Sequence, residues 1–281
     1  MFAIGSAELA IIVLMLAGAT VVPLAIVVVV RAVAAGSADA GHSDTVMAAA
    51  RRGRVVSASA GAAYAGALLV LVVMAIPGRR VGLLAAAPLL AAAVGMAVLL
   101  VAGRSAAREA SGPRRTAALN ARTPELIVKT GWHLVLLVGT VALVVVQLLV
   151  QVRRRHAAPS LTDAPLAAQV IGFAAVILLW AVLSRSAVLR PALAGAPVDV
   201  DNALRRSDAA RATRLAAVGM TQALGFDLLV LAALADGPGA GRAGAGALGV
   251  LLVAAGPWLW AFPSARLPRV LAPAPPSQPV A

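Results

Sequence analysis

The chain has no cysteine, little charge and few aromatic side chains. None of its 281 residues is cysteine, 12% are charged and 3% are Phe, Trp or Tyr. The absence of cysteine excludes disulfides, thiolate chemistry and cysteine-ligated metals. The scarcity of charge excludes most water-soluble domains. Nucleic-acid binding is also disfavoured, because such surfaces interleave basic residues with polar and aromatic ones.

Hydrophobic residues make up 61% of the chain and occur in long runs of Ala, Val and Leu. A helix needs about 20 mostly apolar residues to cross a hydrocarbon core roughly 30 Å thick. The sequence therefore predicts an all-α, polytopic membrane helix bundle of about seven transmembrane helices. The predicted spans are 7–30, 56–76, 81–102, 132–152, 166–184, 215–235 and 246–263.

These spans form one predicted transmembrane domain, residues 1–264. Residues 265–281 are rich in proline, and we expect them to form a disordered cytoplasmic tail, because such a composition can neither bury a core nor hold a helix. The Gly-rich connection 237–246 is predicted to be a flexible linker.

The basic residues predict how the bundle lies in the membrane. The net charge is +13, and every Lys or Arg except Lys129 is arginine. With the N-terminus outside, 18 of the 24 Lys and Arg residues fall in segments 31–55, 103–131, 185–214 and the tail. The positive-inside rule therefore predicts an N-out, C-in orientation.

The junctions that follow the third, fifth and seventh predicted spans are alike. Arg104 and Arg185, which are 81 residues apart, each precede a Ser-Ala pair, and Ser264-Ala265-Arg266 repeats the elements in another order. The pattern indicates one span followed by three parallel hairpin repeats. Convergence on a common stop-transfer signal is the alternative interpretation.

Small residues four positions apart recur within the spans. Such pairs let the backbones of two helices approach closely. They predict a tight bundle rather than one with a wide aqueous pore. The pairs are Gly61/Ala65, Ala62/Gly66, Ala91/Gly95 and Gly219/Ala223.

Asp227 is the most informative polar residue, because it lies in the middle of the predicted span 215–235. A carboxylate at a helix centre costs about 2.5–3.5 kcal/mol on insertion scales, so such residues face the bundle interior or a hydrated cavity. Asp227 is therefore our candidate proton or ion site. A hydrogen bond that serves packing, or a wet position near the outer surface, is the alternative.

Four further polar residues, Gln147, Gln151, Gln222 and His133, lie within predicted spans. Side chains of this kind commonly join neighbouring membrane helices, so we predict polar helix contacts for all four, with a ligand site as the alternative. Gln222 and Asp227 are five residues apart, which separates them by about 140° around a helix. They are therefore not predicted to form a pair.

The sequence favours a non-enzymatic protein without a metal or another cofactor. Asp199-Val200-Asp201 resembles the Asp-x-Asp metal motif of sugar-nucleotide transferases. Asp201-Asn202 is also typical of the N-cap of a short helix, with acidic residues at the positive end of its dipole, and we favour the cap. The three histidines do not have the spacing of a helical metal site.

Arginine pairs in the inner loops predict the chain's main contacts outside the bundle. Arg114, Arg115, Arg205 and Arg206 are expected to contact anionic lipids of the inner leaflet, with a phosphate-bearing ligand as the alternative. The expected partners are thus the lipid bilayer and its anionic lipids, with a membrane protein or a second copy of this chain as further candidates. No nucleic-acid partner is expected.

The loop from Arg114 to Pro124 and the strong Ala/Val/Arg bias resemble uncharacterised multi-pass integral membrane proteins of high-GC actinobacteria. The resemblance implies a multi-pass protein of a bacterial cytoplasmic membrane and no particular activity. Two functions stay open. One is a transporter-like or channel-like module that uses Asp227, and the other is a non-catalytic scaffold or accessory subunit of a larger membrane complex.

Overall fold

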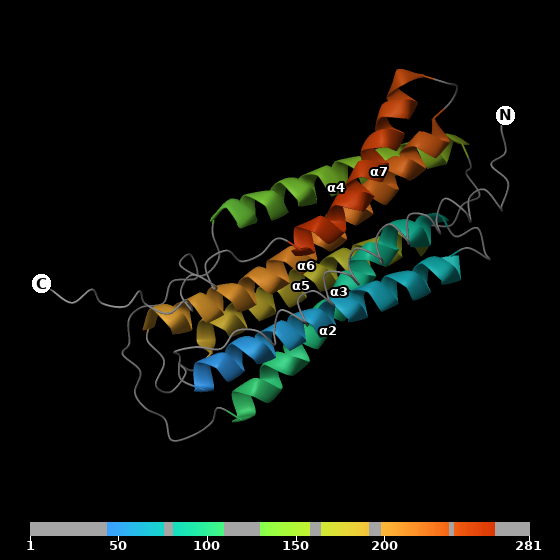
Figure 1. The fold of residues 1–281 in the computed structure, drawn as a ribbon. Coiled ribbons are helices and arrows are strands. Elements are labelled where there is room, and N and C mark those ends of the chain that lie inside the picture. The colour runs from blue at the N-terminus through green and yellow to red at the C-terminus, as the bar shows by residue number, and fades with distance from the viewer. Residues whose placement is uncertain are drawn as a thin grey trace, which may run out of the picture.

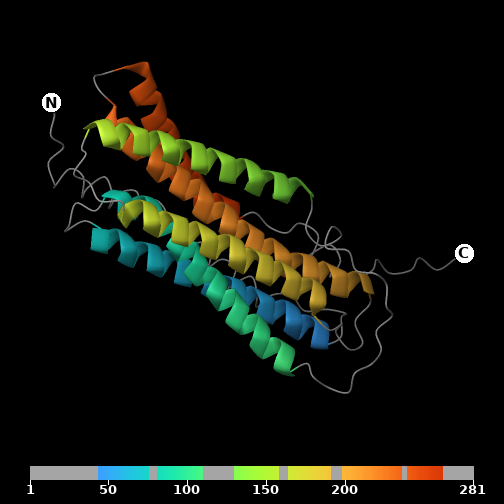
Figure 2. The same cartoon turned by 180° about the vertical axis from the view of Figure 1, so that it is seen from behind.

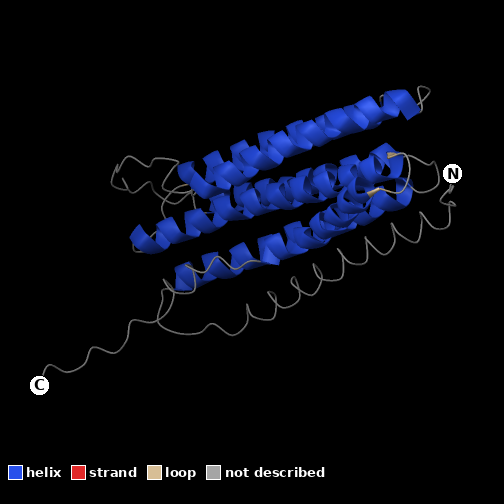
Figure 3. Ribbon diagram, turned by 90° about the horizontal axis from the view of Figure 1, so that it is seen from above, coloured by secondary structure: helices blue, strands red, loops and turns tan. Residues whose placement is uncertain are grey.

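The computed structural model describes residues 44–75, 81–109, 130–157, 164–190, 198–235 and 239–261. All regular structure in these ranges is α-helical (Figure 3). Figure 1 shows the helices side by side as a bundle. They are α2 (Asp44–Ala75), α3 (Val81–Glu109), α4 (Thr130–Ala157), α5 (Ala164–Leu189), α6 (Val198–Leu234) and α7 (Ala240–Ala261).

Six described helices are long and apolar enough to cross a membrane, which supports a multi-pass membrane protein. They overlap the six predicted spans from 56–76 onward. The predicted first span, 7–30, lies outside the described residues, as do the tail 265–281 and the loop that contains Arg114 and Arg115.

Helices α3 and α6 form the centre of the bundle. The protein buries 72% of the most apolar part of α6 and 61% of that of α3, but only 17% of that of α4. Helix α3 packs against α2, α5 and α6, whereas α6 packs also against α4 and α7. The exposed apolar faces of the outer helices are suited to contact with lipid.

Glycine brings the central helices close together. A Cβ atom at Gly219 of α6 would lie 2.6 Å from Cβ of Ala92 and 3.1 Å from the carbonyl oxygen of Pro88, both in α3. One at Gly95 of α3 would lie 2.9 Å from the carbonyl oxygen of Ala60 in α2. These contacts confirm the close packing predicted there. A Cβ atom at Gly66 would have no neighbouring atom within 4 Å.

Consecutive helices run in opposite directions, so the beginnings of α2, α4 and α6 lie at the same end of the bundle as the end of α5 (Figures 1 and 2). Helices α2 and α3 pack against each other, as do α6 and α7, but α4 packs mainly against α6 and makes few contacts with α5. The three predicted hairpins thus do not share one packing arrangement. Their origin by duplication stays a prediction.

Helix α6 is one continuous helix of 37 residues that begins at Val198, well before the predicted start at 215. The predicted N-cap at Asp201-Asn202 is therefore wrong, since Asp201 lies inside the first turn. Asp201 and Arg205 can be helical and buried because they form an ion pair with each other, as described below. Hydropathy alone does not detect this compensation.

The predicted linker 237–246 is also wrong for most of its length, because α7 begins at Ala240. Glycine is a poor helix former in water, at about 1 kcal/mol relative to alanine. In apolar surroundings, however, backbone N–H and C=O groups have to be satisfied within the segment, which favours a helix. Gly241 and Gly244 lie in this first part of α7, where a Cβ atom would have no neighbouring atom within 4 Å.

Candidate functional site

Asp227 of α6 lies inside the bundle, with 1% of its surface exposed. Its carboxylate oxygen Oδ2 accepts a hydrogen bond of 2.6 Å from the side-chain amide Nε2 of Gln169 in α5. Gln169 is itself buried, with 4% exposed. Asp227 therefore faces the protein interior rather than lipid.

Gln147 of α4 completes a cluster of three polar side chains. In the amide orientation that satisfies both its donors and its acceptors, Nε2 of Gln147 donates to Oδ1 of Asp227 at 3.0 Å. The same nitrogen donates to Oε1 of Gln169, also at 3.0 Å. We name Asp227, Gln147 and Gln169 the carboxylate–amide cluster. It joins three helices, two of which otherwise make few contacts with each other.

The carboxylate–amide cluster can accommodate two protonation states of Asp227. A glutamine amide carries two N–H donors and a carbonyl acceptor, whereas a carboxylate only accepts and a carboxylic acid also donates. Rotation of one amide therefore lets the same three side chains pair with either form. An arrangement of this kind can take up and release a proton without exposing an unpaired polar group.

Gln222 belongs to a different cluster, as the helical spacing predicted. The hydroxyl of Tyr64 in α2 donates to Oε1 of Gln222. Nε2 of Gln222 donates to the backbone carbonyl oxygen of Val253 in α7 at 3.0 Å. Tyr64 and Gln222 are both fully buried. Gln222 is thus a polar contact between helices, and it lies on another face of α6 than Asp227.

His133 makes an aromatic contact near the other end of α4. Its ring lies 5.6 Å from that of Trp180 in α5, in an edge-to-face geometry. Nε1 of Trp180 donates to Oγ1 of Thr213 in α6 at 3.1 Å. The predicted helix contact of His133 is therefore made through Trp180. Gln151 is half-buried.

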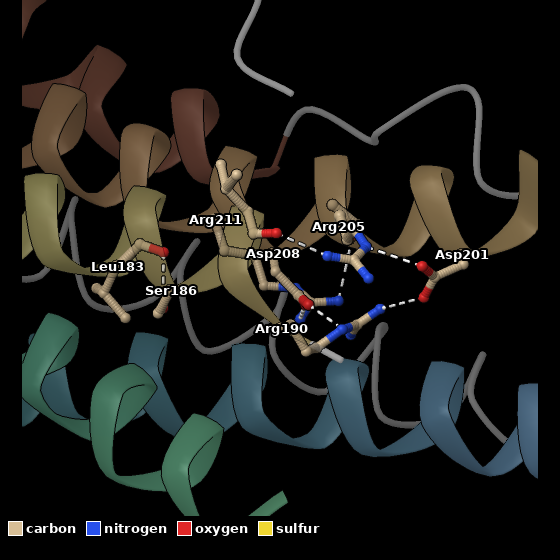
Figure 4. A network of polar contacts seen from close by, with 9 residues as sticks. Leu183, Ser186, Arg190, Asp201, Arg205, Asp208 and Arg211 are labelled. Atoms are coloured by element: carbon tan, nitrogen blue, oxygen red, sulfur yellow. Dashed lines mark hydrogen bonds and ion pairs between the residues drawn. The ribbon is translucent and has the colours of Figure 1, made fainter. Parts of the chain in front are cut away.

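A third group of polar residues lies where the end of α5 meets the beginning of α6 (Figure 4). Asp201 accepts from Arg190 at 3.1 Å and from Arg205 at 2.8 Å. Asp208 accepts from Arg190 at 2.9 Å and from Arg211 at 2.7 Å. We name these five residues the ion-pair network. Both carboxylates bridge two arginines, so the network holds α5 to α6.

The two arginines that were predicted as a pair on the lipid surface lie in different surroundings. Arg205 is fully buried, and its Nη1 donates to the carbonyl oxygen of Val188 at 2.8 Å. Its side chain is thus enclosed by protein, contrary to the predicted surface position, because Asp201 and the end of α5 supply its partners. Arg206 is exposed, and its predicted contact with anionic lipid stays a prediction. Arg114 and Arg115 lie outside the described residues.

The described contacts do not indicate a metal site. The resemblance of Asp199-Val200-Asp201 to a metal motif finds no support in the contacts of Asp201, whose oxygens face two guanidinium groups. In the described parts of the chain, no three His, Asp, Glu or Cys side chains gather in a way that could hold a metal ion. Comparison of the chain with protein-family models, with curated proteins and with solved structures gave no match.

Proposed function

We propose that the chain is a transporter-like or channel-like module of a bacterial cytoplasmic membrane, and that Asp227 carries its coupled proton or cation. The supporting observation is a carboxyl group that is 1% exposed at the meeting point of three helices, with two amide side chains directed at it.

A carboxylate is an expensive choice if its only task is to join helices. Placing it at the centre of a membrane helix costs about 2.5–3.5 kcal/mol, whereas Ser, Thr, Asn or Gln make interhelical hydrogen bonds at lower cost. Unlike Gln147 and Gln169, Asp227 can gain and lose a proton. The proposed transport of a proton or cation depends on this ability.

The test is proton flux through the purified full-length protein in liposomes. A potassium diffusion potential drives protons inward, and an enclosed pH-sensitive dye reports their entry. We expect flux above that of empty liposomes for the wild type and no such flux for Asp227→Asn, which keeps the shape but cannot ionise. Asp227→Glu should retain part of the flux because it restores a carboxyl group.

Thr213→Val is the matched control, since it removes a buried polar group from α6 outside the carboxylate–amide cluster. It should leave the flux unchanged. The same liposomes are tested with a sodium gradient, which covers a cation other than the proton. Unchanged flux in Asp227→Asn contradicts the proposal, and so does a wild type that carries neither ion.

The alternative function is a non-catalytic scaffold or accessory subunit. It is favoured by the close packing of small residues at Gly219 and Gly95, which is typical of a tight helix bundle rather than of a wide aqueous pore. Purification from native membranes in mild detergent tests it. A scaffold should copurify with a stoichiometric partner, and Asp227→Asn should not alter that association.

A further inference from the structure

The ion-pair network has more hydrogen-bond donors than acceptors. Three guanidinium groups, from Arg190, Arg205 and Arg211, face two carboxylates, from Asp201 and Asp208. Each guanidinium carries five N–H donors and no acceptor. Ser207 Oγ and the carbonyl oxygen of Val188 accept one bond each. The described acceptors thus leave a surplus of positive charge and of donors.

Two of the surplus donors are buried. Among the residues that the structure describes, Nη2 of Arg205 and Nε of Arg190 have no hydrogen-bond partner, although neither atom is accessible to solvent. The two guanidinium groups share the carboxylate of Asp201, so they are neighbours (Figure 4). Buried donors without a partner are unfavourable in proteins, so a ligand that supplied acceptor oxygens to them would stabilise the network.

We propose that Arg190 and Arg205 bind a phosphate group, carried either by an anionic lipid headgroup or by a soluble phosphate compound. The planar donors of arginine match the tetrahedral oxygens of phosphate better than those of other cations do. The site also lies at the first turns of α6, where the helix dipole favours negative charge. The side chains of Arg190 and Asp208 are 26% and 32% exposed, so a ligand would approach from their side. Arg205 is fully buried, so these two side chains would have to shift for the ligand to reach its Nη2.

This site is separate from Asp227 and does not depend on the proposed function. It differs also from a diffuse attraction between surface arginines and anionic lipid, because its two donors are buried within a defined network. Arg206 provides the comparison, since it is the next residue after Arg205 but lies on the exposed face of α6.

The binding test uses the full-length protein in a neutral detergent. It is titrated separately with inorganic phosphate, phosphatidylglycerol and phosphatidylcholine, and its thermal unfolding and its mass in native mass spectrometry are recorded. We expect phosphatidylglycerol or phosphate to raise the unfolding temperature, and phosphatidylcholine, which has no net charge, to leave it unchanged. Stabilisation by phosphate alone identifies a soluble source, and stabilisation only by phosphatidylglycerol identifies the lipid.

Three variants locate the binding. Arg205→Gln should raise the half-saturating concentration about tenfold or more, as expected for loss of a hydrogen bond to a charged group, and Arg206→Gln should leave it nearly unchanged. Arg205→Gln also removes a partner of Asp201 and can impair folding. Asp208→Asn addresses this difficulty, because it frees Arg190 and Arg211 from a competing carboxylate and should lower the half-saturating concentration.

A network with a purely structural role predicts a different result for Asp208→Asn, namely a less stable protein without tighter binding. That result overturns the proposal. So does a wild type that neither ligand stabilises, and so does an Arg206→Gln variant that weakens binding as much as Arg205→Gln.

Discussion

The side-chain amide of Gln222 in α6 donates to the carbonyl oxygen of Val253 in α7 at 3.0 Å, and Val253 lies four residues before Pro257. In an uninterrupted helix this carbonyl accepts from the backbone N–H of residue 257, which proline lacks. A side chain from one helix thus replaces a backbone hydrogen bond that is missing in its neighbour. The hydroxyl of Tyr64 holds the amide in place.

This relationship predicts coupling between Gln222 and Pro257. Gln222→Met should lower the free energy of unfolding by about 1–3 kcal/mol, because it leaves a buried carbonyl without a donor. In a Pro257→Ala background the same substitution should cost less, because the alanine N–H satisfies Val253. Unfolding of all four proteins in mixed micelles with increasing dodecyl sulfate measures the coupling as a double-mutant cycle. Equal costs in both backgrounds would show that the amide does not serve this carbonyl.

Tyr64→Phe tests the hydrogen bond that the hydroxyl of Tyr64 donates to Gln222. Phenylalanine fills the same space without the hydroxyl, so we expect a loss of about 1 kcal/mol in the free energy of unfolding. The loss should disappear in the Gln222→Met background, where the hydroxyl has no side-chain amide to bind. A loss that persists there would place the partner of Tyr64 elsewhere.

Gly219 and Gly66 form a matched pair for substitution by alanine. Gly219→Ala should destabilise the protein by about 1–3 kcal/mol, because the new methyl group would meet Ala92 of α3 in a packed core. Gly66→Ala, where the space is open, should be neutral or should stabilise α2 by up to about 1 kcal/mol through helix propensity. Thermal unfolding of the two variants provides the comparison. Equal effects would contradict the close approach of α3 and α6.

Gln169 should stabilise the bundle mainly through Asp227. Gln169→Leu is expected to lower the free energy of unfolding by about 1.5–3 kcal/mol, the range for hydrogen bonds to charged groups. In an Asp227→Leu background the effect should fall well below that, since no carboxylate is left to satisfy. The measurement is again a double-mutant cycle in mixed micelles, and additive effects would disprove the pairing.

The orientation is testable without purification. A fluorescent protein fused to the C-terminus should fluoresce in the cytoplasm, and a reporter enzyme that is active only in the periplasm should be silent there. Arginine is concentrated at the end of the bundle where α5 ends and α6 begins, which is the basis of this prediction. The opposite pattern of reporter activity would place this end, and Arg205 with it, on the outer side.

The positions of six spans could be predicted from hydropathy, because a membrane helix of about 20 apolar residues is a strong signal. The extent of α6 could not, because its first part looks like a charged loop. What makes this part helical and buried is the pairing of Asp201 and Asp208 with three arginines, and one of these, Arg190, lies in a different segment of the chain. Asp201–Arg205 and Asp208–Arg211 are local helix pairs, whereas the contacts of Arg190 become visible only in three dimensions.

The candidate site could be predicted in part. Asp227 stands out because a lone carboxylate in an apolar span is costly, and the angle along α6 separates it correctly from Gln222. Gln169 did not stand out, although it is the one polar residue between Leu166 and Leu183. Its depth could have linked it to Gln147, since both residues lie toward the outer ends of their predicted spans. The hydrogen bond from Gln222 to the carbonyl oxygen of Val253, which Pro257 leaves without its backbone donor, could not be predicted without knowing which helices are neighbours.

The length of α6 sets how its two polar sites are connected. Thirty-seven residues make a rod about 55 Å long, which exceeds the hydrocarbon thickness of a membrane by roughly 25 Å. Asp201 and Asp227 lie about 39 Å apart on this rod, and no proline or break in the helix separates them. A tilt or rotation of α6 as a rigid body would therefore move both sites together.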